Sequence, residues 1–157
     1  MRMWPALCAG LILAACTSDN SGQHSAEPPP AMSSGVAIPG ETSEPMSTIS
    51  DRVLFQTDSA LLQPEAQHVL LQQATWLQQY PKHTLTIEGH ADERGTREYN
   101  LALGERRAQA VLNYLIALGV DPKRLKTISY GKERPTCTEP NEACWSQNRR
   151  GVSTLDQ

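Results

Sequence analysis

The sequence has few of the features on which nucleic-acid binding depends. Its formal net charge is −3, and its aromatic residues are three Trp, four Tyr and one Phe among 157 residues. No basic stripe is present to neutralise phosphates, and few rings are present to stack on bases. These two shortages exclude a nucleic-acid partner.

The chain also lacks an apolar run long enough to cross a bilayer, which takes about 20 residues. Its main apolar run, residues 6–15, is shorter, follows the positive Arg2 and ends at Cys16. A positive residue before a short apolar run is typical of a secretory signal. We therefore predict that residues 1–15 are a signal peptide.

Cys16 follows the residues Leu-Ala-Ala, an arrangement that resembles a bacterial lipobox. In a lipobox the thiol is acylated and the preceding peptide is removed; the alternative is a plain secretory signal with a chance cysteine. Several acyl chains would hold Cys16 at a membrane, since each buried methylene contributes about 0.8 kcal/mol. The residue after Cys16 is Thr17 and not Asp, a pattern that resembles the signal directing bacterial lipoproteins to the outer membrane. We expect an outer-membrane, lipid-anchored protein whose domain faces the periplasm.

The composition of the chain that follows the predicted signal peptide changes at about residue 50. Residues 16–50 comprise the lipidated Cys and a stretch rich in Ser, Thr, Pro and Glu, and such a stretch buries too little apolar surface to fold. We predict a disordered tether there and one globular domain at 51–157. Periodicity within it predicts strands at 52–56, 84–89, 125–130 and 152–155, and helices at 64–80 and 98–118. This order predicts an α/β (α+β) sandwich, in which helices cover one sheet.

No nucleophile motif such as GxSxG is present, and no carboxylate pair has an evident acid and base role. Glu88, His90 and Asp92 alternate, so a metal site is conceivable, but His68 and His83 stand in no ligand-like motif. We therefore expect no enzyme, no catalytic residues, no cofactor and no metal. The alternatives are a peptidoglycan hydrolase or a metal-binding envelope protein.

Two neighbouring segments carry the candidate binding chemistry. Asp92 follows the strand at 84–89, and Asn100, Leu103 and Arg107 share one ridge of the next helix while Arg106 points away. Arg107 is expected at the edge of the core, opposite Asp92 across a shallow cleft. Such a pair suits a zwitterion, whose ammonium meets a carboxylate and whose carboxylate meets a guanidinium. Spacing alone, however, favours a structural ion pair.

The run GHADERGTREYNLALGERRAQAV, from Gly89 to Val111, resembles the OmpA C-terminal-like family, more narrowly the peptidoglycan-associated lipoproteins of the Tol–Pal system. Residues 129–135 and 148–150 fit the same pattern. The resemblance implies one mixed sheet and a non-covalent grip on the meso-diaminopimelate of peptidoglycan. It also implies the periplasmic β-propeller protein TolB as partner, and support of envelope integrity and of outer-membrane invagination during cell division.

The resemblance further implies which residues bind. Asp92 and Arg107 would hold the free end of diaminopimelate. The other residues carried over are Asn100, Leu103, Phe55, Ala91 and Thr96. Gly104 replaces a common Ser, and Gln56 replaces the usual Asp, which removes a charge. The closing residues 151–157 are more polar than is usual, so the last strand is expected to be frayed or short.

Cys137 and Cys144 complete the sequence features. In an oxidising compartment two such cysteines can pair, and the alternative is two free thiols. The short loop that they enclose would contribute at most about 2.5 kcal/mol to stability.

Overall fold

The computed structural model describes residues 49–156. The predicted signal peptide, the predicted lipidation site Cys16 and nearly all of the predicted tether lie outside these residues. Within 49–156 the elements follow the order strand, helix, strand, helix, strand, helix, strand. Their bounds are β1 Arg52–Leu54, α1 Pro64–Gln79, β2 Leu85–His90, α2 Arg97–Ala117, the 3-10 helix η2 Pro122–Arg124, β3 Leu125–Gly131, α3 Glu142–Asn148 and β4 Arg150–Leu155.

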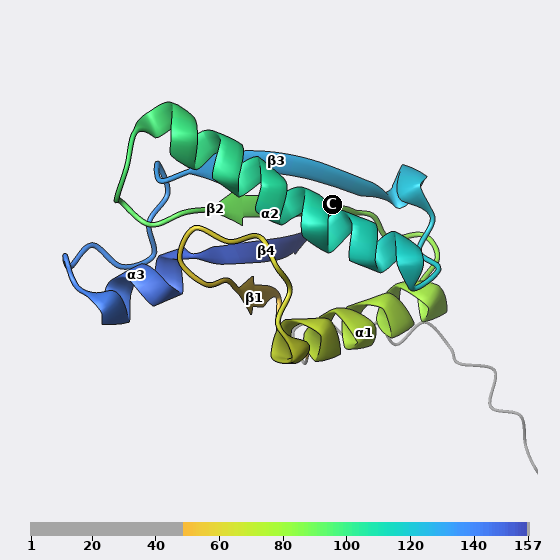
Figure 1. Cartoon of the computed structure of the whole chain (residues 1–157). Helices are drawn as coiled ribbons and strands as arrows, with labels where there is room; N and C mark the ends of the chain where they lie inside the picture. Colours follow the sequence, from red (N-terminus) through yellow and green to blue (C-terminus); the bar gives the residue numbers. More distant parts are fainter. Residues whose placement is uncertain (1–48, 157) are drawn as a thin grey trace, which may run out of the picture. The chain divides into compact units, whose positions relative to one another are not determined.

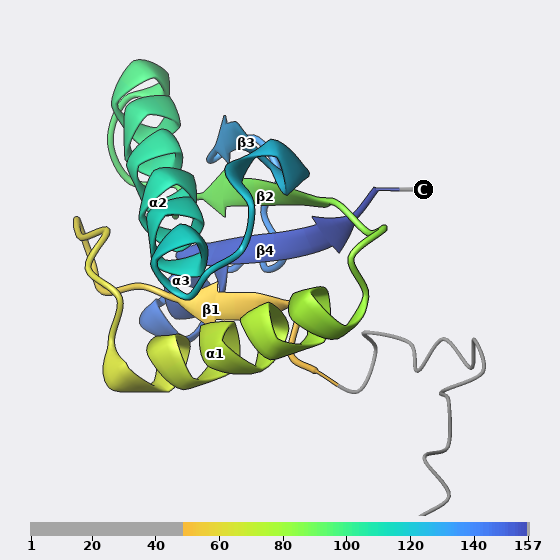
Figure 2. The same cartoon turned by 90° about the vertical axis from the view of Figure 1, so that its right-hand side faces the viewer.

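The four strands form one mixed sheet in the order β1-β4-β2-β3. β2 and β3 run parallel, whereas β4 is antiparallel to both β1 and β2. Helices α1 and α2 cover one face of the sheet, and the short α3 lies at one end (Figures 1 and 2). This arrangement confirms the predicted sandwich of one mixed sheet and covering helices.

Apolar side chains between the helices and the sheet form the core. The alternation predicted for β2 is confirmed, since Leu85 and Ile87 are both fully buried. Helical spacing puts Leu101 on the same face of α2 as Leu115, which is equally buried, but Leu101 is 48% exposed. Leu101 lies in the first turns of α2, and its carbonyl accepts a hydrogen bond from the Ser129 hydroxyl at 2.6 Å. The buried face of α2 therefore begins later along the helix than this spacing predicts.

The expectation of a frayed last strand is wrong. β4 spans six residues and lies inside the sheet, between β1 and β2. Its polar residues have partners: the buried Ser153 hydroxyl donates to the side-chain oxygen of Gln73 at 2.8 Å. Just beyond the strand, the Asp156 carboxylate accepts hydrogen bonds from the hydroxyls of Thr84 and Thr86. Satisfied polar groups can be buried at little cost, so polarity here does not indicate disorder.

α2 crosses β2 where two glycines meet. A Cβ atom added to Gly89 would lie 1.8 Å from the carbonyl oxygen of Gly104. A Cβ added to Gly104 would lie 2.3 Å from the Ser129 hydroxyl oxygen and 2.8 Å from the Gly89 carbonyl oxygen. The helix and the strand thus approach so closely that neither position has room for a side chain.

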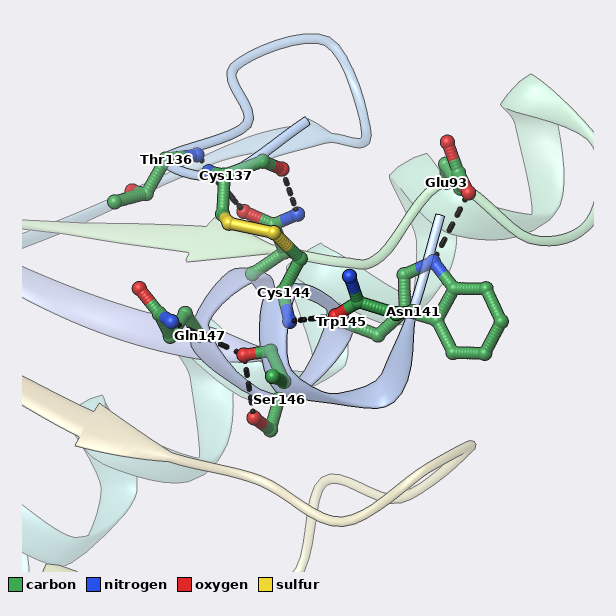
Figure 3. Close-up of a disulfide and its surroundings, with 10 residues drawn as sticks. Glu93, Thr136, Cys137, Asn141, Cys144, Trp145, Ser146 and Gln147 are labelled. Atoms are coloured by element: carbon green, nitrogen blue, oxygen red, sulfur yellow. Dashed lines mark hydrogen bonds between the residues drawn. A yellow bond between two sulfur atoms is a disulfide. The ribbon is translucent and has the colours of Figure 1, made fainter. Parts of the chain in front are cut away.

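Helix α3 was not predicted, because its seven residues are too few to show a helical period. The Asn141 side chain caps its start by accepting a hydrogen bond from the Cys144 amide at 3.0 Å. A disulfide joins Cys144 to Cys137 in the preceding loop, as predicted (Figure 3). The Asn148 side chain bonds the same loop, accepting from the Cys137 amide and donating to its carbonyl. α3 is therefore fastened to this loop at both of its ends.

No helix within residues 49–156 has the length and apolarity needed to cross a membrane.

The contact between Gly89 and Gly104 generates a first prediction. Gly89→Ala should lower the free energy of unfolding by about 3 kcal/mol or more, because its Cβ would meet a backbone carbonyl. Gly104→Ala should also destabilise but cost less, since its nearest backbone atom lies 2.8 Å from the added Cβ, the closer Ser129 side chain can rotate, and alanine favours the helix by about 1 kcal/mol. Urea unfolding measures both. Equal stability of Gly89→Ala and the wild type would contradict this close approach.

His90, the last residue of β2, generates a second prediction. Its side chain is 2% exposed, its ring centroid lies 5.5 Å from that of Tyr130, and its Nε2 lies 3.3 Å from a Glu88 carboxylate oxygen. Burial, with smaller contributions from the charges of Arg150 and Arg134, lowers the pKa of His90 to about 4. The unfolded chain therefore binds a proton below pH 6.5 that the folded chain rejects until about pH 4.

Stability should consequently fall by about 2–3 kcal/mol as the pH drops from 7 to 4.5. Urea unfolding at these two pH values should show the loss in the wild type and in His68→Asn, since His68 is exposed. His90→Asn should remove most of the pH dependence in this window. An unchanged slope in His90→Asn would assign the effect to other groups.

Candidate functional site

The loop that follows β2 presents Asp92 near the start of α2. The Ala91 amide continues the sheet by donating to the Gly131 carbonyl at 2.8 Å. Gly95 then takes a φ of 90°, a conformation that glycine adopts without strain. The Thr96 hydroxyl caps α2 by accepting a hydrogen bond from the Tyr99 amide at 3.2 Å. Asp92 is thus set between a strand end and a capped helix start.

The Asp92 carboxylate is almost buried, at 7% exposure, and is bound by two arginines. Arg94 donates from Nε to Oδ1 at 3.1 Å and from Nη2 to Oδ2 at 2.7 Å, and its backbone amide also reaches Oδ1 at 3.1 Å. Arg149 donates from Nη1 to Oδ2 at 3.4 Å. Burial alone would raise the pKa of Asp92, but the Arg94 hydrogen bonds outweigh it and hold the pKa below its usual value. Asp92 is therefore an anion at neutral pH.

Arg107 lies in the core, with no exposed surface, and not at the core's edge as expected. Its Nε donates to the Ser59 carbonyl at 2.9 Å, its Nη1 to the His90 carbonyl at 2.7 Å and its Nη2 to the Gln56 carbonyl at 3.0 Å. Burial lowers its pKa to about 10, and the negative Asp92 opposes that shift. Arg107 therefore remains a cation at neutral pH.

The structural ion pair that spacing favoured, Asp92 with Arg107, is replaced by pairs of Asp92 with Arg94 and Arg149. The physical reason is proximity. Arg94 stands two residues from Asp92 in the same turn, and carbonyl oxygens already surround the guanidinium of Arg107. Asp92 and Arg107 still influence each other electrostatically.

A pocket of about 260 Å³ opens beside Asp92. Three residues chosen from the sequence line it, namely Asp92, Asn100 and Leu103. The other lining residues are Thr57, Asp58, Arg94, Gly95 and Tyr99. Two carboxylates and one guanidinium therefore face one small space, an arrangement suited to a ligand that carries both signs of charge.

The remaining residues chosen from the sequence do not line this pocket. Phe55 is buried with its ring centroid 5.3 Å from the Arg107 guanidinium, and Ala91 is buried behind the loop. Thr96 is exposed and serves as the helix cap. Gln56 also has an exposed side chain, and only its carbonyl takes part in the site, as an acceptor for Arg107.

Sequence reasoning missed the two arginines that bind Asp92. Arg94 could have been found, because a side chain two residues from an Asp in a Gly-containing turn can fold back onto it. Arg149 could not have been found from the sequence, because it follows α3, far along the chain from Asp92, and only the fold brings the two together. Its Nε donates to the Phe55 carbonyl at 3.1 Å, and its Nη2 pairs with the Glu142 carboxylate. Arg149 thus ties α3 to the end of β1 and to Asp92.

Comparison with known proteins identifies the family of this chain. The OmpA family pattern matches residues 54–149. Two proteins named peptidoglycan-associated lipoprotein, from Mesorhizobium japonicum and Brucella melitensis, are 49% and 47% identical to this chain; each alignment covers 96% of the chain and 89% of the relative.

A similar solved structure is that of the peptidoglycan-associated lipoprotein from Burkholderia pseudomallei, with a TM-score of 0.67 and 42% identity. The match covers 68% of this chain and 91% of that one. The C-terminal domain of Helicobacter pylori MotB, at 23% identity and a TM-score of 0.64, shares the fold. The chain belongs to the OmpA family and, within it, to the peptidoglycan-associated lipoproteins.

Proposed function

We propose that this protein binds the peptide part of peptidoglycan non-covalently and catalyses no reaction. The ligand group is the free end of meso-diaminopimelate, which carries one ammonium and one carboxylate. The observation that carries the proposal is the ionised, nearly buried Asp92 at a pocket that also holds a guanidinium. The names of the similar proteins point to the same polymer.

Asp92 is proposed to receive the ammonium group. Asn100 and Leu103 shape the pocket beside it, and the Asn100 amide holds the loop by donating to the Arg94 carbonyl at 2.7 Å. Arg107, which is fully buried and does not line the pocket, is proposed to attract the ligand carboxylate by its charge at longer range and not by direct contact. Three of its five N–H groups are used, and its bonds to Gln56 and Ser59 position the loop that contributes Thr57 and Asp58 to the pocket.

The wider role proposed is that of a link between outer membrane and cell wall. A lipid on Cys16 would hold the protein at the outer membrane, and residues 17–50 would let the domain reach the wall in the periplasm. Within the Tol–Pal system the partner would be TolB, and the link would support envelope integrity and outer-membrane invagination during cell division. This role is supported by membership of the peptidoglycan-associated lipoproteins.

The ligand site predicts that Asp92→Asn weakens binding to purified sacculi by about ten- to a hundredfold. A hydrogen bond to a charged group contributes roughly 1.5–3 kcal/mol, and the substitution removes the charge that the ammonium requires. Arg107→Lys should also weaken binding, because one ammonium cannot bond the three carbonyls that position the loop with Thr57 and Asp58. Pull-down with sacculi over a range of protein concentrations measures both.

Arg106→Ala is the control, because Arg106 is exposed on α2 and does not line the pocket. Thermal unfolding of each variant identifies losses caused by misfolding. If folded Asp92→Asn bound sacculi as tightly as the wild type, Asp92 would not be the ligand's partner.

The anchor generates a separate prediction. Cys16→Ser should abolish palmitate labelling and move the protein from the outer-membrane fraction, because the proposed acylation needs the thiol. Metabolic labelling followed by membrane fractionation tests this expectation, with Cys8→Ser as the matched control. Label that persists in Cys16→Ser would show that the lipid is attached elsewhere.

A further inference from the structure

Asp92 already has a cationic partner in this structure. Arg94 reaches both oxygens of its carboxylate with two side-chain nitrogens, at 3.1 and 2.7 Å. An ammonium group that is to bind Asp92 must therefore displace at least part of the Arg94 side chain. Displacement has a cost, because it leaves a guanidinium without the partner that it had.

Arg94 differs from the other cations near Asp92 in its exposure to solvent, which leaves space for another side-chain conformation. Its side chain is 40% exposed, whereas that of Arg149 is 5% exposed and Arg107 is fully buried. Arg94 is also the one cation among the residues that line the pocket. A ligand carboxylate in the pocket therefore reaches Arg94 without any rearrangement of the core.

Trp145 keeps the Arg94 guanidinium beside the pocket. The guanidinium carbon lies 4.3 Å from the Trp145 ring centroid, within the range of a cation–π contact. The indole is itself fixed, since its Nε1 donates to the Glu93 carboxylate at 2.9 Å (Figure 3). On the other side, Arg94 Nη2 lies 3.3 Å from the Thr57 hydroxyl. Released from Asp92, the guanidinium would remain over the ring and next to the ligand.

We propose that Arg94 sets ligand specificity by exchanging partners: the ligand ammonium replaces it at Asp92, and the ligand carboxylate binds the freed guanidinium. This inference rests on the proposed function and adds the residue that discriminates among stem peptides. A zwitterionic side-chain end leaves every charge paired after the exchange. An end with an ammonium alone, as in lysine-type stem peptides, leaves Arg94 unpaired and is penalised. Arg94 thus favours diaminopimelate by excluding simple amines.

The test compares three synthetic tripeptides that end in meso-diaminopimelate, in its side-chain amide, or in lysine. Isothermal titration of the full mature chain in detergent measures their affinities for the wild type, Arg94→Gln and Arg97→Gln. Arg97 is the matched control, because it lies in the same segment but pairs with Glu133 on the surface, 3.2 Å away, and does not line the pocket.

The wild type should prefer diaminopimelate over lysine by about tenfold or more, and Arg94→Gln should lower this ratio about tenfold. Diaminopimelate should bind that variant more weakly, and lysine equally or more tightly. Arg97→Gln should keep the wild-type ratio. Arg94→Lys, which keeps the charge but loses the fork, should give an intermediate ratio.

An unchanged preference for diaminopimelate over lysine in folded Arg94→Gln would overturn the exchange. An equal gain in affinity for all three peptides would overturn it too, because Arg94 would then only compete with every ligand for Asp92. A wild type that binds diaminopimelate but does not discriminate against lysine would overturn it too. Failure of the wild type to bind any of these peptides or sacculi would instead refute the proposed function itself.

Discussion

A buried cation holds the binding end of this domain together. Arg107 donates to carbonyls from two separate segments, namely the loop after β1 at Gln56 and Ser59 and the end of β2 at His90. A guanidinium without exposed surface is costly to bury unless its N–H groups are bonded, so these carbonyls must remain where they are. The course of the loop at residues 56–59 follows from that requirement. This loop in turn supplies Thr57 and Asp58 to the pocket.

The same cation affects the charge balance around Asp92. Arg107 acts at longer range, Arg149 holds one carboxylate oxygen from α3, and Arg94 binds both oxygens from the pocket side. The hydrogen bonds and charge of Arg94, with a hydrogen bond from Arg149, keep the carboxylate ionised despite its burial. The three arginines differ in exposure, because Arg107 and Arg149 are buried and the Arg94 side chain is 40% exposed. Arg94 makes the shortest hydrogen bond to Asp92, so a ligand that displaces Arg94 must itself supply a positive charge to that carboxylate.

Periodicity in the sequence predicted most of the fold. The alternation of Leu85 and Ile87 and the limits of the helices that contain Leu70 and Leu115 depend on local patterns, and the structure agrees closely with them. α3 escaped notice because it is short and is held by a disulfide and by Asn148, which are tertiary contacts. The last strand was underestimated because the partners of its polar groups, such as Gln73 for Ser153, come from a distant helix.

The site was predictable to a similar extent. Helical spacing correctly placed Asn100, Leu103 and Arg107 on one buried face. Spacing could not show that backbone carbonyls would engage Arg107 or that Arg149 would approach Asp92, since both facts depend on how distant segments meet. Asp58 and Tyr99 also line the pocket, and spacing could not predict them for the same reason.

The position of β4 has a consequence for how the protein is made. The strand nearest the C-terminus lies between β1 and β2, so the first strand has no place in the sheet until the last one is present. A chain that emerges amino end first can form α1, β2, α2 and β3, but β1 must wait for residues 150–155. Arg149, next to that strand, completes the surroundings of Asp92 at the same moment. A chain with this topology therefore cannot complete its sheet until residues 150–155 are available to pair with β1 and β2.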